Sequence, residues 1–470
     1  MRLRNLGTFL FASIFLFSLL RTHARDLVAL ETFDQVWRTL NENHFDTNFN
    51  GHNWNEVRDN YRPRAAAARN GDALREVVQE MLDLLNVSHL AIVPGEFTSD
   101  LELDNSDSND DTSSRKPAEN DNNESENSET EPASRASQSL EEADEGDRGT
   151  VGMDFRYIGK DLVVTRVEPN LPAAKAGVMP GWIIKRIGQT ETAKLKQKLP
   201  KKLDDRRRAF LAWRAAAAKL SGDPGSKVAV DFIDSRNRSK KLTLTRATAQ
   251  GEPIKFGTLP VLYAHLEEES VQSQRGKSVG VIRFNIWMLP TAIAFNKAID
   301  EHRDKSGMII DLRGNVGGMV GMIIGTAGHF VTKPTTLGTL IARDNTLKLP
   351  ANPRFVDTSG KRVQPFSGPV AILVDEITAS ASEVFAGGLQ ENGRVRVFGR
   401  TTAGQALPAV YSQLPNGDAL YHPVADFIAA NGTRFEGRGV VPDERVESDR
   451  AALLAGRDLV LERALHWIDR

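Results

Sequence analysis

Apolar positions between residues 26 and about 94 recur at the spacing of one helix face. This pattern predicts amphipathic helices, because residues three and four apart lie on the same side of an α-helix. Asp72 is suited to cap a helix that runs to Asn86. Residues 87–94 then have the pattern of a turn leading into a strand, so we expect an N-terminal helical domain over 26–97. The apolar positions are Phe33, Val36, Trp37, Leu40, Leu74, Val77, Val78, Met81, Leu82 and Leu85.

The pattern changes to short β-like runs between residues 149 and 247. Residues 161–167 combine β-branched and apolar side chains in the way that strands do. A short alanine-rich stretch begins at Pro172, and a turn follows at residues 180–182. We therefore predict a small β-rich module over 149–247.

Short apolar runs alternate with helical patterns from about residue 258 to 446. Apolar runs bounded by Gly or Pro are typical of buried strands that helices cover on both faces. The expected strands are 278–284, 308–312 and 370–374, and the expected helices are 290–302 and 382–392. This alternation predicts an α/β core over 258–446, followed by a C-terminal helix over 447–470. The whole chain is predicted to be a multi-domain α/β protein.

Composition narrows the possible functions. The 470 residues are 40% hydrophobic and carry a net charge of −2, so the overall charge gives no sign of a nucleic-acid binder. The chain has no cysteine, which excludes disulfides, thiolate metal sites and cysteine nucleophiles. Covalent catalysis would therefore use an oxygen or an amine. No spacing of histidines and carboxylates predicts a metal site, and we expect no cofactor.

The N-terminus has the pattern of an export signal. A basic start precedes an apolar run at residues 6–20, which is short for a membrane-spanning helix. We predict a signal peptide over 1–24 and a periplasmic or extracellular location. The alternative is an uncleaved segment that anchors the protein to the membrane.

Residues 98–148 are dominated by Asp, Glu, Asn and Ser. Such a segment cannot bury enough apolar surface to offset its ordering entropy, so we predict a disordered acidic insert. A calcium-binding or partner-binding segment is the alternative, although the regular spacing of a calcium loop is missing.

One predicted strand runs directly into a turn of small residues and then into a helix. The apolar run at 370–374 is followed by the sequence TASASE at 378–383. Ser380 would lie at the start of that helix, where free backbone N–H groups and the helix dipole favour an oxyanion. This makes Ser380 a candidate nucleophile. The alternative is that Ser380 or Ser382 only caps the helix, with Glu383 completing a capping box.

A glycine-rich loop follows another predicted strand. The sequence DLRGNVGG occupies 311–318. Glycines let backbone N–H groups approach a ligand closely, so Gly317 or Gly318 could form an oxyanion hole together with Ala381. By itself this loop does not distinguish a catalytic loop from an ordinary turn.

Together these stretches resemble the serine peptidase family that contains the carboxyl-terminal processing proteases and the tricorn core protease. The resemblance covers most of the chain from residue 26 to about 446, because the motifs occur in the family's order. They are DLRGNVGG at 311–318, the turn at 378–389, VFGRTTAG at 397–404 and GVVPD at 439–443. The resemblance implies a helical domain, a PDZ domain and a core of the ClpP/crotonase-like type.

The family offers two catalytic arrangements. In carboxyl-terminal processing proteases a lysine at the position of Gln405 is the base, and glutamine does not accept a proton at neutral pH. The tricorn-like branch instead uses a Ser-His pair before the PDZ domain and a Glu before the closing Gly-Val-x-Pro-Asp stretch. By this resemblance His89 is the general base, and Ser88 and Glu436 orient and polarise it. The alternative for His89 is a structural histidine.

The order of features over 149–247 resembles a PDZ domain, which binds an extended peptide by adding it as a strand. The turn at 180–182 departs from that pattern because it lacks the usual Asp. A β-domain that only packs against the core or gates it is the alternative. By resemblance, the peptide-binding loop consists of Gly152, Met153, Asp154 and Phe155.

The resemblance and the motifs together predict an exported serine peptidase of the tail-specific protease type. It would hydrolyse peptide bonds in proteins or peptides through an acyl-enzyme on Ser380, with His89 as base. A non-catalytic peptide- or ligand-binding protein on the same fold is the alternative, because the missing lysine could mark lost catalysis. An esterase or other acyl hydrolase would use the same site. The expected partner is a protein or peptide substrate, and the sequence indicates no oligomeric state.

Overall fold

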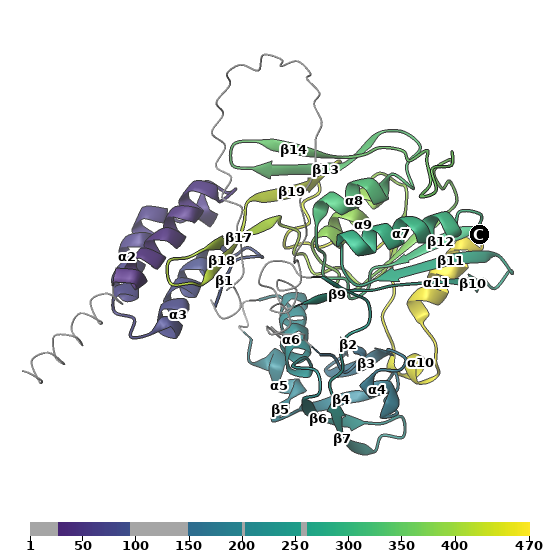
Figure 1. Cartoon of the computed structure of the whole chain (residues 1–470), viewed down its shortest axis with the longest axis horizontal. Helices are drawn as coiled ribbons and strands as arrows, with labels where there is room; N and C mark the ends of the chain where they lie inside the picture. Colours follow the sequence, from purple (N-terminus) through teal and green to yellow (C-terminus); the bar gives the residue numbers. More distant parts are fainter. Residues whose placement is uncertain (1–26, 95–148, 200–202, 255–260) are drawn as a thin grey trace, which may run out of the picture.

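The computed structural model describes residues 27–94, 149–199, 203–254 and 261–470. The expected signal peptide and the expected acidic insert lie outside these residues. Figure 1 shows the N-terminal helices at one side of an α/β core, with a β-rich module below that core. Within the described ranges, no helix is both long and apolar enough to cross a bilayer.

The N-terminal region is helical, and it ends in a strand that joins the core. Asn70, and not the predicted Asp72, caps α3: Asn70 has extended backbone and its side chain accepts a hydrogen bond from the Ala73 N–H. Strand β1 pairs antiparallel with β18, so the segment that carries Ser88 and His89 is fixed to the core. The elements are a helix over 27–43, η1 (Phe49–Gly51), α2 (Trp54–Ala66), α3 (Gly71–Leu82), η2 (Asp83–Leu85) and β1 (Ala91–Val93).

Residues 149–247 form an antiparallel sheet in the order β2-β3-β4-β6-β7, with β5 beside β4. Strand β2 is an edge strand, and its inward-facing side chains join the buried cluster of this module. Three helices accompany the sheet, and α6 is the longest. The bounds are β2 (Met153–Ile158), β3 (Asp161–Val167), α4 (Pro172–Lys175), β4 (Ile183–Ile187), β5 (Thr190–Glu191), α5 (Thr192–Gln197), α6 (Asp205–Leu220), β6 (Lys227–Ile233) and β7 (Ser239–Thr245).

The core contains a six-stranded sheet in the order β10-β11-β12-β15-β16-β20, in which β11 to β20 run parallel. Alternate residues of each central strand face opposite sides, as a pleated strand requires. Thus Ile310 and Ile372 pack with α7, α8 and α9, whereas Ile309 and Leu373 pack with α11. This two-sided burial explains the continuous apolar runs of the sequence.

The core elements confirm the predicted mixed α/β, multi-domain fold. Their bounds are β10 (Leu266–Gln272), β11 (Ser278–Phe284), α7 (Leu289–Glu301), β12 (Gly307–Asp311), α8 (Val320–Ala327), β15 (Val370–Val374), α9 (Ala381–Glu391), β16 (Arg396–Gly399), β20 (Glu444–Arg445) and α11 (Leu459–Ile468). Smaller sheets flank this layer. They contain β8 (Glu252–Ile254), β9 (Leu262–Ala264), β13 (Thr335–Ala342), β14 (Thr346–Ala351), β17 (Ala409–Gln413), β18 (Ala419–Pro423) and β19 (Ala425–Ala429).

The C-terminal segment differs from the single helix that the sequence predicts. It consists of α10 (Arg450–Leu454) and α11, separated at Gly456. Gly456 has φ +71, a left-handed conformation that ends a helix readily, and the Asp458 side chain caps α11.

Candidate active site

Two adjacent parallel strands bring the predicted loops together. Strands β12 and β15 pair with each other, and Asp311 lies opposite Leu373. The glycine-rich loop leaves the carboxyl end of β12, and the turn that carries Ser380 leaves the carboxyl end of β15. In parallel sheets, binding sites form where such carboxyl ends meet.

Ser380 occupies the N-cap position of α9 in a strained backbone conformation, with φ 55 and ψ −124. Positive φ is uncommon for a residue with a side chain and marks a conformation that the surroundings must hold. Here the Ser380 N–H donates to the Gln405 carbonyl at 2.8 Å and to Glu383 Oε2 at 3.0 Å. The bond from the Ser380 N–H to Glu383, which is one half of the capping box that the sequence allowed, is therefore present at the candidate nucleophile.

The glycine-rich loop lies directly against Ser380. A Cβ on Gly317 would come within 2.6 Å of Ser380 Cβ, so only glycine fits. The Gly317 N–H already donates to Asn315 Oδ1 at 3.0 Å. In contrast, the N–H groups of Gly318 and Ala381 have no hydrogen-bond acceptor among the described residues. The geometry thus favours Gly318 over Gly317 as the second oxyanion donor.

Glu383 is fully buried one turn into α9 and gathers the neighbouring loop around Ser380. Its carboxylate accepts hydrogen bonds from Thr402 Oγ1, from the N–H groups of Gly404 and Gln405, and from the Ser380 N–H. Burial outweighs these four donors and raises the pKa of Glu383 to about 7. Glu383 therefore fixes the position of Ser380 relative to residues 402–405.

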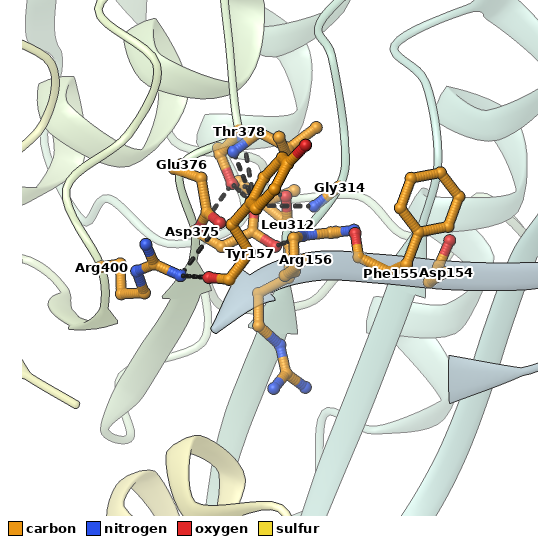
Figure 2. Close-up of polar contacts among 12 residues, drawn as sticks. Asp154, Phe155, Arg156, Tyr157, Leu312, Gly314, Asp375, Glu376, Thr378 and Arg400 are labelled. Carbon is orange, nitrogen blue, oxygen red and sulfur yellow. Dashed lines mark hydrogen bonds and ion pairs between the residues drawn. The ribbon is translucent and has the colours of Figure 1, made fainter. Parts of the chain in front are cut away.

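A buried ion pair joins both loops to β2 of the module (Figure 2). Asp375 Oδ2 accepts from Arg156 Nε at 2.5 Å, while Asp375 Oδ1 accepts from the N–H groups of Gly314 and Thr378 at 3.0 and 3.1 Å. Burial alone would raise the pKa of Asp375, but Arg156 and the backbone donors outweigh it and lower that pKa. Thr378 Oγ1 also donates to the Leu312 carbonyl at 2.9 Å.

The base side of the site is a short hydrogen-bond chain. Ser88 Oγ lies 2.6 Å from His89 Nδ1 and donates to Glu436 Oε2 at 2.9 Å, and the Ser88 N–H donates to Glu436 Oε1 at 2.8 Å. Because Ser88 gives its only hydroxyl proton to a carboxylate, it accepts from His89 Nδ1. His89 Nε2 is then unprotonated and able to take a proton.

Burial shifts both ionisable groups of this chain toward their neutral forms. Burial, reinforced by the charge of Arg214, lowers the pKa of His89 to about 4. Burial also raises the pKa of Glu436 above its usual value, against the donors on Ser88 and Ala406. His89 is therefore a neutral imidazole at neutral pH.

Residues 404–406 connect the two halves of the site. The Gln405 carbonyl accepts from the Ser380 N–H at 2.8 Å, and the next N–H, that of Ala406, donates to Glu436 Oε2 at 3.0 Å. No hydrogen bond joins His89 directly to Ser380 among the residues that the structure describes. Catalytic hydrogen bonds are often looser before substrate binds.

Helix α6 of the module contacts each segment of the site. Arg207 donates to the Val87 carbonyl at 3.3 Å, beside Ser88, and Arg206 donates to the carbonyl of Gly437, beside Glu436. Phe210 packs in a buried cluster with Ile377, Ala379 and Ala403, which surround the turn before Ser380.

The predicted peptide-binding residues make one contact to the Arg156–Asp375 pair, because the Phe155 carbonyl accepts from Arg156 Nη1 at 2.7 Å. Gly152 precedes β2 with φ +72, and Met153 and Phe155 point into the core of their own module. Asp154 forms an ion pair with Arg283 at 2.7 Å. Arg156, which follows Phe155, contacts the loops of the site directly through Asp375.

The sequence reasoning missed Arg156 and Asp375, and it treated Glu383 only as a cap. No local pattern marks Arg156, because its partner Asp375 is 219 positions away. The N–H donors of Gly404 and Gln405 to Glu383, and that of Ala406 to Glu436, can be found only in three dimensions. Within the described part of the chain, no group of three or more His, Asp or Glu side chains is arranged to hold a metal ion.

Comparisons with known proteins show what parts of the chain are similar to. Residues 278–446 match peptidase family S41, and residues 29–83 match the tricorn protease C1 domain. A carboxyl-terminal-processing protease of Synechocystis sp. is 24% identical over 418 residues, which is 88% of this chain and 80% of the relative. The chloroplastic carboxyl-terminal-processing peptidase 2 of Arabidopsis thaliana is 29% identical over 284 residues, 60% of this chain and 49% of the relative. The match thus spans about half of the Arabidopsis protein.

Solved structures share the fold. The photosystem II D1 C-terminal processing protease superposes with a TM-score of 0.55 at 19% identity, over 91% of this chain and 96% of that protein. Mature CPAF superposes with a TM-score of 0.57 at 12% identity, over 94% and 96%. The S41 match covers Ser380, Glu383 and Glu436, whereas Ser88 and His89 lie beyond residue 83, where the tricorn C1 match ends. The α/β core of this chain is thus similar to peptidase family S41.

Proposed function

We propose that this chain is a serine peptidase that hydrolyses peptide bonds in proteins or peptides through an acyl-enzyme. Ser380 is the nucleophile, His89 is the general base, and Ser88 with Glu436 orients the imidazole. The N–H groups of Ala381 and Gly318 stabilise the oxyanion at the start of α9.

The proposed reaction proceeds in two steps. His89 Nε2 takes the hydroxyl proton of Ser380 as Oγ attacks the substrate carbonyl, and the oxyanion forms beside Gly318 and Ala381. The C–N bond then breaks, and His89 returns the proton to the leaving amine. A water molecule, deprotonated by His89, next attacks the ester, and Ser380 regains its proton as the acid product leaves.

One observation supports this function above the others: hydrogen bonds from residues 404–406 reach both halves of the site. They hold the backbone of Ser380 on one side and the Glu436–Ser88–His89 chain on the other. A protein that only bound peptides would not need a neutral, oriented imidazole in the same hydrogen-bond network as a strained serine at a helix N-terminus.

Reaction with a serine-directed fluorophosphonate probe tests the proposal. The mature protein should be labelled at Ser380, and Ser380→Ala should lose both labelling and cleavage of an unfolded protein substrate while its circular dichroism spectrum is unchanged. Ser382→Ala is the neighbouring control, because Ser382 is buried and bonded to Trp287 Nε1. Full turnover by Ser380→Ala would refute the assignment. Absence of labelling in the folded chain would favour a binding protein.

The module at 149–247 is proposed to be a PDZ-like domain that binds substrate as an added strand. The position of β2 at the end of the module's sheet supports this, because an edge strand can pair with an extended peptide. A peptide would compete there with the hydrogen bonds that the carbonyls of Phe155 and Tyr157 accept from Arg156 and Arg400. A proline replacing Phe155 or Tyr157 should weaken binding of a labelled peptide if the edge is the site. Unchanged binding would argue for a packing role.

Export and carboxyl-terminal cleavage are also proposed. Relatives named carboxyl-terminal processing peptidases, two of them chloroplastic, support a role outside the cytosol and at chain ends. Cell fractionation and N-terminal sequencing of the mature chain would test export and removal of residues 1–24. The proposed boundaries are a helical domain at 26–97, the module at 149–247, the core at 258–446 and the C-terminal segment at 447–470.

A further inference from the structure

Helix α6 presents a charged residue toward the base side of the site. Arg207 is anchored on the Val87 carbonyl, two residues before His89. Arg214 follows seven residues later, which is about two helical turns, so it lies on the same face roughly 10 Å farther along the helix. Phe210, between them, packs against the turn before Ser380. The face that carries Arg214 is therefore the face that α6 turns toward the site.

The charge of Arg214 acts on a cluster of three rings. His89 and Tyr421 have ring centroids 5.6 Å apart, and Tyr421 stacks on Tyr411 at 4.5 Å. Burial raises the pKa of both tyrosines, and the positive charge of Arg214 opposes that shift at each of them, as it lowers the pKa of His89. The field of one guanidinium thus reaches His89, Tyr411 and Tyr421 together.

The guanidinium has no protein partner there. Arg214 is exposed and forms no ion pair or hydrogen bond with any described residue. The hydroxyls of Tyr411 and Tyr421 likewise form no hydrogen bond within the described ranges. A guanidinium offers five N–H donors and a phenolic hydroxyl offers one O–H donor, and both kinds of group bind carboxylates.

We propose that Arg214 binds a carboxylate of the substrate on the leaving-group side of the scissile bond. The inference rests on the proposed function, because His89 protonates the leaving amine and thereby marks that side. The carboxylate can belong to an acidic side chain or to the end of the substrate chain. Binding it neutralises the positive charge near His89, which makes the imidazole a stronger base only when the preferred substrate is present.

Paired peptides separate the two sources of the carboxylate. Mass spectrometry first locates the bond that the wild type cuts in a test peptide. Variants of that peptide then carry Glu or Gln at each of the three following positions, each with a free or an amidated C-terminus. The wild type should prefer the carboxylate form by about 10-fold or more in kcat/KM, the usual size for a charge-assisted hydrogen bond. The Glu and Gln peptides test an acidic side chain as the source of the carboxylate, and the free and amidated C-termini test the end of the substrate chain.

Arg214→Gln should reduce that preference to about twofold or less, and Arg214→Glu should favour a Lys peptide. Lys219→Gln is the matched control, since Lys219 is also exposed on α6 but points roughly 140° away. The proposal is overturned if Arg214→Gln keeps the wild-type preference, if Lys219→Gln loses it, or if the wild type shows none.

Two further measurements keep the inference separate from the catalytic proposal. Fluorescence anisotropy measures the binding of the acid and amide peptides without cleavage, on Ser380→Ala with and without Arg214→Gln. If each protein binds the acid and the amide peptide with equal affinity, the role of Arg214 is refuted even if Ser380 is the nucleophile. The acid limb of kcat/KM should also move to higher pH in Arg214→Gln, because a positive charge no longer disfavours protonation of His89. Glu436, Tyr411 and Tyr421 also face His89 and are unchanged in this comparison.

Discussion

At the scale of single residues, the hydrogen bonds of Ser88 decide the chemistry of His89. Ser88 Oγ donates to Glu436 and accepts from His89 Nδ1, so the imidazole has Nε2 free. Burial and Arg214 lower the pKa of His89 to about 4. A base must be unprotonated to act, so a lowered pKa keeps His89 active into more acidic solution than an ordinary histidine would allow.

On the acid side, kcat/KM should therefore fall near pH 4 and not near pH 6.5. The measurement is a pH–rate profile with a peptide that carries no titratable group. His89→Ala should lower kcat/KM by about 10²- to 10⁴-fold, the usual contribution of a general base, and should remove that limb. A limb near pH 6.5 would mean that His89 is solvated during turnover.

A second prediction concerns the effect of Glu383 on the stability of the fold. Its pKa is raised to about 7 in the folded chain, against an ordinary value of 4.5. Between these values the unfolded chain has lost the proton that the folded chain keeps, so raising the pH destabilises the fold. The expected readout is the difference in melting temperature, wild type minus Glu383→Gln. This difference should decrease from pH 4.5 to pH 7 and stay constant above pH 7. A difference that rises over this window would contradict the assignment.

At the scale of elements, the turn after β15 is held by a contact with another module. Asp375 ties Gly314 and Thr378 together through backbone hydrogen bonds, and its charge is balanced by Arg156 of β2. Both side chains are nearly fully buried. The position of the oxyanion loop therefore depends on where β2 sits.

Arg156→Met should lower the free energy of unfolding by about 3–5 kcal/mol, because it leaves a buried carboxylate unpaired. Unfolding in urea measures this, and kcat should fall as the loops separate. Arg166→Met on β3 is the control: its pair with Glu267 is partly exposed, so a loss below about 1 kcal/mol is expected. Adding Asp375→Asn to Arg156→Met should recover part of the stability. Equal losses from Arg156→Met and Arg166→Met would show that the ion pair does not hold the turn.

The same elements show which parts of the structure the sequence predicts. The strands at 278–284 and 370–374 were predicted with their observed bounds, because apolar runs between helical segments are a local signal. Gly317 and Gly318 were predicted as alternatives, and the bond from Gly317 to Asn315 distinguishes them. The Arg156–Asp375 contact and the face of α6 depend on packing between distant segments, which no local pattern encodes.

At the scale of the whole molecule, the C-terminal segment joins the module to the core (Figure 1). Helix α11 packs on the core sheet through Val460 and Ile468. Arg450 of α10 donates to the carbonyls of Gly181 and Asp234 and to Asn237 Oδ1, at 2.8, 3.0 and 3.0 Å. Gly181 belongs to the turn that lacks the usual Asp, and a Cβ there would come within 2.6 Å of Leu454 Cγ. A glycine at this turn lets the segment approach.

Arg450→Ala should therefore loosen the module while leaving α11 on the core. The chain has no cysteine, so spin labels on Lys240→Cys in β7 and Lys297→Cys in α7 report one distance between module and core. The distribution of this distance should be narrow in the doubly labelled parent and broad in Arg450→Ala. The value of kcat/KM should also fall in Arg450→Ala, because α6 and Arg156 then lose their fixed positions. Arg457→Ala is the control, since Arg457 pairs with Glu462 inside the same segment. A narrow distribution in Arg450→Ala would mean that the contacts of α6 and Arg156 alone hold the module.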